Sequence, residues 1–254
     1  MSSEKLLPWA KPLLISSTLT QATIYVLRPM ITYRALELDA NAAQIGLIAS
    51  VYALFPVVLA LHFGKWVGRM GEAKFIIYGT LAMLVTSAAL MFADSITLLA
   101  LAAGAAGLAH LACMVGGQSM VALRAPRESY DRYFGFYTFS ASVGHMLGPI
   151  FAAIVAGSNG NLPRSTSNAF LLGVVLTILA IFPVIRWRNE RPTVVAQQSS
   201  KGTYKTAINL VKRPGILAAI YISLAISSVA DVLVVFLPLF GTENNFSPYA
   251  VGAI

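Results

Sequence analysis

The sequence predicts an all-α integral membrane protein. Of its 254 residues, 57% are hydrophobic and only 11% are charged, whereas an ordinary soluble domain has about 25% charged residues. The mean hydropathy is +0.73. Apolar runs of about 20 residues, each long enough to cross a hydrocarbon core about 30 Å thick, recur along the chain. The runs are continuous and do not alternate with period two, which favours helices over an outer-membrane barrel.

Seven such runs predict about seven transmembrane helices. The first has basic residues before it, as a signal peptide does, but its length and the presence of Gln21 and Arg28 favour a retained helix. The other six combine the required length with few charges, and a helix satisfies its own backbone inside the bilayer. The seven predicted helices cover residues 13–33, 43–63, 75–93, 96–122, 134–157, 169–185 and 215–240.

The basic residues gather on one side of the predicted membrane. If the seven runs cross in turn, fifteen of the eighteen Lys and Arg residues fall on the side of the N-terminus. The positive-inside rule assigns that side to the cytoplasm. We therefore expect a multi-pass protein of the inner or plasma membrane with a cytoplasmic N-terminus. The net charge of +8 then reflects topology and does not indicate nucleic-acid binding.

The runs divide the chain into three parts. Residues 1–186 carry six helices, residues 187–214 form a polar cytoplasmic connection, and residues 215–254 carry the seventh helix and the start of an eighth. Within the connection, TYKTAINLVK fits either a short amphipathic helix at the membrane surface or a plain linker. A helix with a proline, a short acidic loop and a glycine-containing segment recurs after about 207 residues, which predicts two parallel halves and a chain truncated within the second.

Enzymatic chemistry has little support in the sequence. Cys113 is the only cysteine, so neither an intrachain disulfide nor a cysteine-based metal site is expected. We find no glycine-rich phosphate loop, zinc-ligand spacing or positioned nucleophile with its base. The sequence predicts a protein that is not an enzyme and that uses no cofactor.

The connection between the second and third helices carries a motif. Its sequence GKWVGRMGEAK, residues 64–74, resembles the signature loop of the major facilitator superfamily, G-x-x-x-D-R-x-G-x-R-R, with Gly68 and Ala73 in place of the acidic residue and one basic residue. The glycines would permit a tight turn between closely packed helices, and the cations would act at the gate between halves. A plain basic loop is the alternative. The matching residues are Gly64, Arg69, Gly71 and Lys74.

The fifth helix carries a second motif. GHMLGPIFAA, residues 144–153, is similar to the family's G-x-x-x-G-P-x-x-G-G, which is often associated with exporters. Gly144 and Gly148 share one face and predict a close helix contact, and Pro149 predicts a bend. The fourth helix departs from the family, because Ala103 stands where an arginine is often found. Together the motifs imply a major-facilitator-like bundle of two six-helix halves.

Arg28 and Asp231 are the only Asp, Glu, Lys or Arg residues inside the predicted helices, where a charge costs at least about 2.5 kcal/mol. Gln21, Tyr25, Arg28 and Thr32 form one polar stripe, which predicts a face turned toward a cavity. The family bundle implies that the first and seventh helices line that cavity together. The alternatives are that Arg28 snorkels to the membrane surface or that the pair is a structural salt bridge.

Histidines add candidate proton sites. His110, Met114 and Gln118 follow one another at intervals of four on the fourth predicted helix, and His145 lies inside the glycine motif of the fifth. A histidine in a membrane core either titrates near neutral pH or serves as a hydrogen-bonded packing residue.

Taken with the family resemblance, these features predict a secondary transporter. Two halves would rock around a midplane site and move a small molecule in exchange for or together with protons, with a slight preference for export. An anionic group on that molecule is one partner that Arg28 could hold. The expected substrate or coupling residues are Arg28, Asp231, Gln21, Tyr25, His110, Gln118 and His145. An inactive transporter remnant and a seven-helix receptor are the alternatives.

Overall fold

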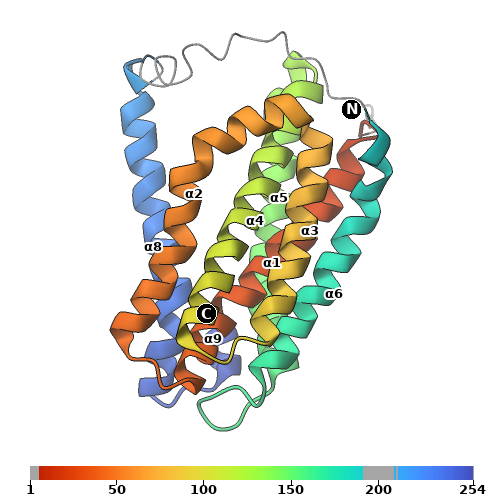
Figure 1. The fold of residues 1–254 in the computed structure, drawn as a ribbon. Helices are drawn as coiled ribbons and strands as arrows, with labels where there is room; N and C mark the ends of the chain where they lie inside the picture. Colours follow the sequence, from red (N-terminus) through yellow and green to blue (C-terminus); the bar gives the residue numbers. More distant parts are fainter. Residues whose placement is uncertain (1–5, 191–208, 210, 254) are drawn as a thin grey trace.

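The computed structural model describes residues 6–190, 209 and 211–253, and these form a helical bundle (Figure 1). The predicted alternatives for TYKTAINLVK fall largely outside the described residues. The elements are α1 (Ala10–Glu37), α2 (Ala42–Met70), α3 (Glu72–Met91), α4 (Ile96–Arg124), η1 (Arg127–Ser129), α5 (Tyr130–Ala156), α6 (Thr166–Val184), η2 (Ile185–Asn189), α8 (Ile216–Glu243) and α9 (Pro248–Ala253).

Six described helical segments are long and apolar enough to cross a membrane: 42–70, 72–91, 96–124, 127–156, 166–189 and 216–243. The first predicted helix, α1, is not among them, although it has 28 residues. It is rich in Ser, Thr and Gln, and these side chains are buried by neighbouring helices, with Gln21 only 2% exposed. The most polar long helix therefore lies at the centre of the bundle, where partners satisfy its polar groups.

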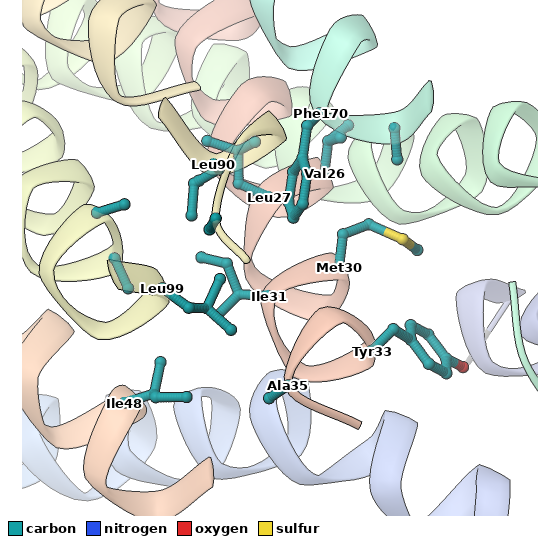
Figure 2. Packing of buried hydrophobic residues seen from close by; sticks show 14 of the residues in the cluster. Val26, Leu27, Met30, Ile31, Tyr33, Ala35, Ile48, Leu90, Leu99 and Phe170 are labelled. Carbon is teal, nitrogen blue, oxygen red and sulfur yellow. The ribbon is translucent and has the colours of Figure 1, made fainter. Parts of the chain in front are cut away.

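The apolar half of α1 organises the core. Figure 2 shows Val26, Leu27 and Ile31 of α1 packed with side chains from the surrounding helices. Phe170 comes from α6, and Leu90 and Leu99 come from α3 and α4. Inside a bilayer such packing stabilises through van der Waals contact, because lipid is as apolar as the side chains.

Helices α2, α4 and α6 begin with polar caps at the end of the bundle opposite the N-terminus. Asn41 and Gln44 form a reciprocal capping box at the start of α2, and Ser95 and Ser165 cap α4 and α6. Each cap satisfies a backbone N–H that the first turn leaves without a partner. These caps help to fix the first residues of α2, α4 and α6.

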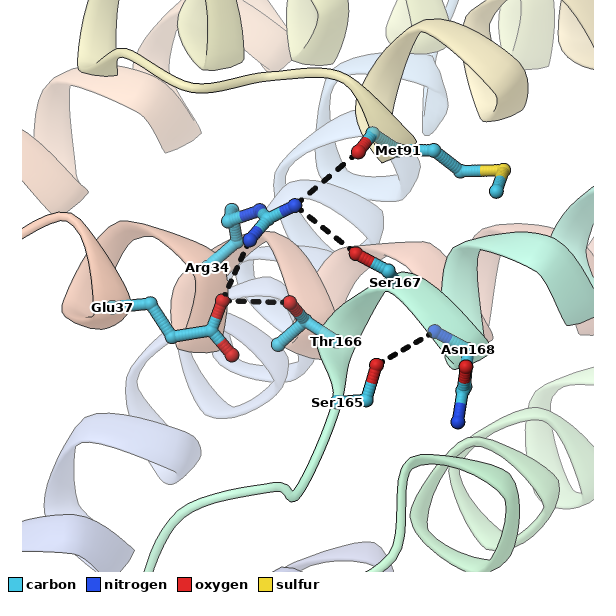
Figure 3. Close-up of polar contacts among 7 residues, drawn as sticks. All are labelled: Arg34, Glu37, Met91, Ser165, Thr166, Ser167 and Asn168. Atoms are coloured by element: carbon cyan, nitrogen blue, oxygen red, sulfur yellow. Dashed lines mark hydrogen bonds and ion pairs between the residues drawn. The ribbon is translucent and has the colours of Figure 1, made fainter.

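Arg34 connects three helices at that same end (Figure 3). It donates to Glu37 Oε2 at 2.9 Å, to the Met91 carbonyl at 3.3 Å and to Ser167 Oγ at 3.2 Å. The Thr166 hydroxyl donates to the same Glu37 oxygen at 2.8 Å. The end of α1 is therefore fastened to the end of α3 and to the start of α6.

Two glycines bring α5 against α1. A Cβ atom on Gly144 would stand 2.8 Å from Gln21 Cβ, and one on Gly148 would stand 2.7 Å from Tyr25 Cβ. Real Cβ atoms do not approach so closely, so only glycine allows this separation of the helices. Pro149 lies inside α5, and its carbonyl faces Gly252 of α9.

α8 packs on α1 through its second half. Leu217 and Tyr221 in its first turns are 64% and 73% exposed, whereas Val235 is 9% exposed. In Figure 1 the first half of α8 stands apart from α1 near the end that holds the N-terminus. The contact between the first and seventh predicted helices is thus restricted to the opposite end.

The structure corrects the prediction for GKWVGRMGEAK. Residues 64–70 belong to α2, so the connection is Gly71 alone, with φ 87° and ψ 147°. A Cβ atom on Gly64 would meet nothing within 4 Å, so Gly64 neither makes the turn nor allows close packing. Helix α2 continues to Met70 and ends where Gly71 takes a positive φ, which glycine adopts without steric cost. Arg69 is exposed and Lys74 is half-buried on either side of that turn.

Candidate functional site

Arg28 of α1 and Asp231 of α8 are in contact. Arg28 Nη1 lies 2.6 Å from Asp231 Oδ1, and the two side chains are 10% and 57% exposed. The arginine is thus nearly enclosed, while the carboxylate still reaches open space. Since the residues are 203 positions apart, only the packing of α8 on α1 brings them together.

Neighbouring groups hold the arginine in place. The Arg28 guanidinium lies 5.1 Å from the centre of the Tyr52 ring on α2, an arrangement in which the ring attracts a cation. One turn further along, the Thr32 hydroxyl donates to the Val235 carbonyl at 3.0 Å. This buried bond fixes the register of α8 against α1, and with it the position of Asp231.

Gln21 joins two histidines from different helices. Its Oε1 atom accepts from Nε2 of His110 on α4 and from Nε2 of His145 on α5, each at 3.1 Å. The Gln21 amide nitrogen faces Met114 Sδ at 2.7 Å. A carbonyl oxygen only accepts, so this arrangement assigns the proton of each imidazole to Nε2.

Two tyrosines complete this polar cluster. The Tyr25 ring stacks on His145 with centroids 4.1 Å apart. The Tyr52 hydroxyl lies 3.0 Å from His110 Nδ1, the nitrogen left free to accept. Sequence reasoning missed Tyr52, and its only signal was a hydroxyl inside the apolar run 43–63. Tyr52 contacts both the histidine cluster and Arg28, so the two polar groups form one connected site.

Gln118 does not belong to this site. It is exposed, and among the described residues no hydrogen bond joins it to His110 or Met114. It shares the helical face of His110 and Met114 but lies one turn, about 6 Å, beyond Met114 toward the N-terminal end of the bundle. At that end the first half of α8 stands apart from α1 (Figure 1).

A cavity of about 370 Å³ lies between α1, α5, α8 and α9. Its walls are mainly apolar, with Pro29, Met30, Pro149 and Leu237 among them, and His145 and Tyr25 supply polar edges. Small-molecule sites commonly combine such an apolar wall with a few polar groups. The cavity therefore borders the histidine cluster at His145 and Tyr25.

A second charged group lies at the N-terminal end of the bundle. Arg124 at the end of α4 contacts Glu72 Oε1 at 2.8 Å and Glu190 Oε2 at 2.6 Å. Glu72 is 1% exposed. The prediction that only Arg28 and Asp231 lie within helices is therefore wrong, because the helices extend past the apolar runs and include charges at their ends. The link fastens the segment after η2 to α3 and α4.

Comparison with known sequences identifies relatives. The chain is 23% identical over 146 residues to Multidrug resistance protein 1 of Bacillus subtilis (strain 168), a match that covers 57% of this chain and 38% of that protein. It is 24% identical over 152 residues to Multidrug resistance protein MdtG of Salmonella arizonae, covering 58% and 38%. Each match thus covers well under half of the relative.

Comparison with solved structures identifies the fold. A bacterial homologue of the human lysosomal transporter Spinster, in an inward-facing and unoccupied conformation, has a TM-score of 0.74 at 16% identity, with 98% of this chain and 59% of that chain covered. The occupied inward-facing form of such a homologue has a TM-score of 0.72 at 17% identity, with 98% and 58% covered. At this identity the likeness establishes the shared fold.

The family model described as Major Facilitator Superfamily matches residues 13–254. This match covers nearly the whole chain, including the segments that carry Arg28, the histidines and Asp231. It agrees with the transporter-like bundle and favours a transporter over a seven-helix receptor. The chain belongs to the Major Facilitator Superfamily of transporters.

Proposed function

We propose that the chain forms the substrate and coupling site of a secondary active transporter that works by alternating access. The observation that carries this proposal is the contact between Arg28 on α1 and Asp231 on α8. A buried arginine is costly in a membrane and is retained where it binds an anion or lines a pathway. A carboxylate that is 57% exposed remains able to exchange protons with water.

The geometry supports different roles for the two charged residues. Arg28 binds an anionic group of the substrate through its planar fork of N–H donors. Asp231 holds Arg28 when no substrate is present, and it takes up a proton when the substrate displaces it. Because α8 contacts α1 only in its second half, separation of the pair would allow the two helices to move apart. His110, His145, Gln21 and Tyr25 line the same site beside the pair.

Export of a small molecule against protons is the direction we favour. The Gly144–Pro149 segment is similar to a motif associated with exporters, and two relatives are named multidrug resistance proteins. The mainly apolar cavity beside His145 suits a lipophilic body attached to the anionic group.

A growth and efflux assay tests this function. Cells that express the full-length protein should survive higher doses of at least one lipophilic acid from a panel of toxic acids, cations and neutral compounds. A protonophore should remove the protection, because it collapses the gradient that drives efflux. Protection against cations alone would contradict the role of Arg28. A chain that reaches the membrane but protects against no compound and moves none in vesicles supports the inactive remnant.

We also propose that the N-terminal end of the bundle faces the cytoplasm of a cell membrane, since the order of the predicted helices assigns fifteen of the eighteen Lys and Arg residues to that side. Single cysteines at Glu128 and Asn159, both exposed and at opposite ends, should label oppositely in a Cys113→Ala background. An impermeant maleimide should modify position 159 in intact cells and position 128 only after lysis. Labelling of position 128 from outside would reverse the orientation.

A further inference from the structure

Three metal-binding atoms converge on the side-chain amide of Gln21. Nε2 of His110 and Nε2 of His145 each lie 3.1 Å from Oε1 of the amide, and Met114 Sδ lies 2.7 Å from its Nε2. We propose that His110, Met114 and His145 form a binding site for a soft monovalent metal ion, Cu(I). The amide of Gln21 stands where the ion binds. This proposal concerns binding and does not depend on the transport function.

The ligand set selects the ion. Imidazole and thioether groups are soft ligands, and the thioether of methionine favours Cu(I). All three groups are neutral, so bound Cu(I) brings one positive charge into the membrane interior, whereas Zn²⁺ would bring two at a higher desolvation cost. Among the described residues no group of three or more His, Cys, Asp or Glu side chains could hold a metal ion.

The histidines are able to turn their free nitrogens toward the ion. Coordination through Nε2 requires the ring proton on Nδ1, a tautomer change that leaves the imidazole neutral. His110 Nδ1 lies 3.0 Å from the Tyr52 hydroxyl, which then accepts that proton in a hydrogen bond, as partners of metal-bound histidines commonly do. The stack on Tyr25 holds the ring of His145 in its orientation.

The Gln21 side chain has an alternative position near Ser17. Ser17 lies one turn earlier on α1, so its side chain neighbours that of Gln21 on the same face. Ser17 Oγ is buried beside the Tyr137 hydroxyl without a well-aligned hydrogen bond, and Ser17 and Gln21 line one small cavity together with Thr20 and Cys113. The cavity holds only about 10 Å³, so rotation of Gln21 toward Ser17 requires neighbouring side chains such as Thr20 and Tyr137 to shift, and it would free the space between the two histidines and Met114.

Anaerobic titration of the purified 254-residue chain with Cu(I), in competition with the chelator bicinchoninate, tests the proposal. Replacement of one ligand, by His110→Gln, His145→Gln or Met114→Leu, should raise the Kd for Cu(I) at least about tenfold. Gln21→Ala should lower the Kd, because the competing amide is gone. The X-ray absorption spectrum of the bound ion should show both nitrogen and sulfur neighbours in the wild-type chain, and Met114→Leu should lose the sulfur.

The chain supplies matched controls. His62 is the third histidine and is exposed, and Met146 is 62% exposed, so His62→Gln and Met146→Leu should leave the Kd unchanged. Cys113→Ala should also leave it unchanged, which separates this site from the thiol. A wild-type chain that fails to compete with the chelator would overturn the proposal. Weaker binding by Gln21→Ala would do the same, even where a histidine variant fails to fold.

Discussion

Replacing Asp231 by asparagine is expected to abolish gradient-driven transport while leaving substrate exchange. Asparagine keeps the shape of the side chain but carries no proton between the two sides of the membrane. Arg28→Gln should lower both modes at least about 30-fold, because loss of a charge that pairs with a bound anion costs about 2 kcal/mol or more. The transport rate of Arg28→Lys should lie between those of the wild type and Arg28→Gln, since one ammonium replaces a bidentate fork. Uptake into proteoliposomes, with and without a proton gradient, measures both modes.

The two single variants should also differ in stability. Asp231→Asn leaves the nearly buried Arg28, 10% exposed, without its carboxylate partner, and this costs about 1–3 kcal/mol. Arg28→Gln leaves Asp231, 57% exposed, where water solvates it. The thermal unfolding midpoint should therefore fall more for Asp231→Asn.

The double variant decides between a functional site and a structural pair. If Arg28 binds substrate and Asp231 carries the proton, Arg28→Gln with Asp231→Asn stays inactive. If the two charges only neutralise each other, the double variant regains transport, because no uncompensated charge remains. Wild-type transport by both single variants would remove Arg28 and Asp231 from the mechanism altogether.

Replacing Gly148 by leucine is expected to prevent normal packing of α5 on α1. A Cβ atom there would stand 2.7 Å from Tyr25 Cβ and 2.8 Å from the Ala22 carbonyl, and neither the backbone nor a Cβ can rotate away. Overpacking of this kind costs about 1–3 kcal/mol, and more where backbone must shift. The yield of monodisperse protein in detergent and its thermal unfolding midpoint should both fall sharply.

Gly135→Leu is the matched control for that change. Gly135 lies in the same helix, and a Cβ atom there would meet nothing within 4 Å. Both substitutions gain the same intrinsic helix propensity, so the difference between them isolates the contact with α1. Equal unfolding midpoints for the two variants would show that the helices do not need this close approach.

Much of the fold could be read from the sequence because it depends on local properties. The length of an apolar run sets a helix, and glycine at intervals of four marks a face where another helix comes close. Helix ends were less predictable, since α2 continues through the glycines at 64 and 68 until Gly71 takes a positive φ. The central, buried position of α1 could not be predicted from its own sequence either, because its polar side chains make it the least apolar of the long helices.

The candidate site divides in the same way. The sequence alone identified Arg28 and Asp231 as candidates, since a charge within an apolar run is costly in a membrane whatever the tertiary fold. Only the tertiary structure decided that they touch, that Gln21 joins His110 to His145, that Tyr52 enters the cluster and that Gln118 stays outside it. These contacts join residues up to 203 positions apart, and their register depends on close approaches such as Gly148 against Tyr25 and on bonds such as Thr32 to Val235. Such a register is a property of packed pairs of helices, which no single helix specifies by its own sequence.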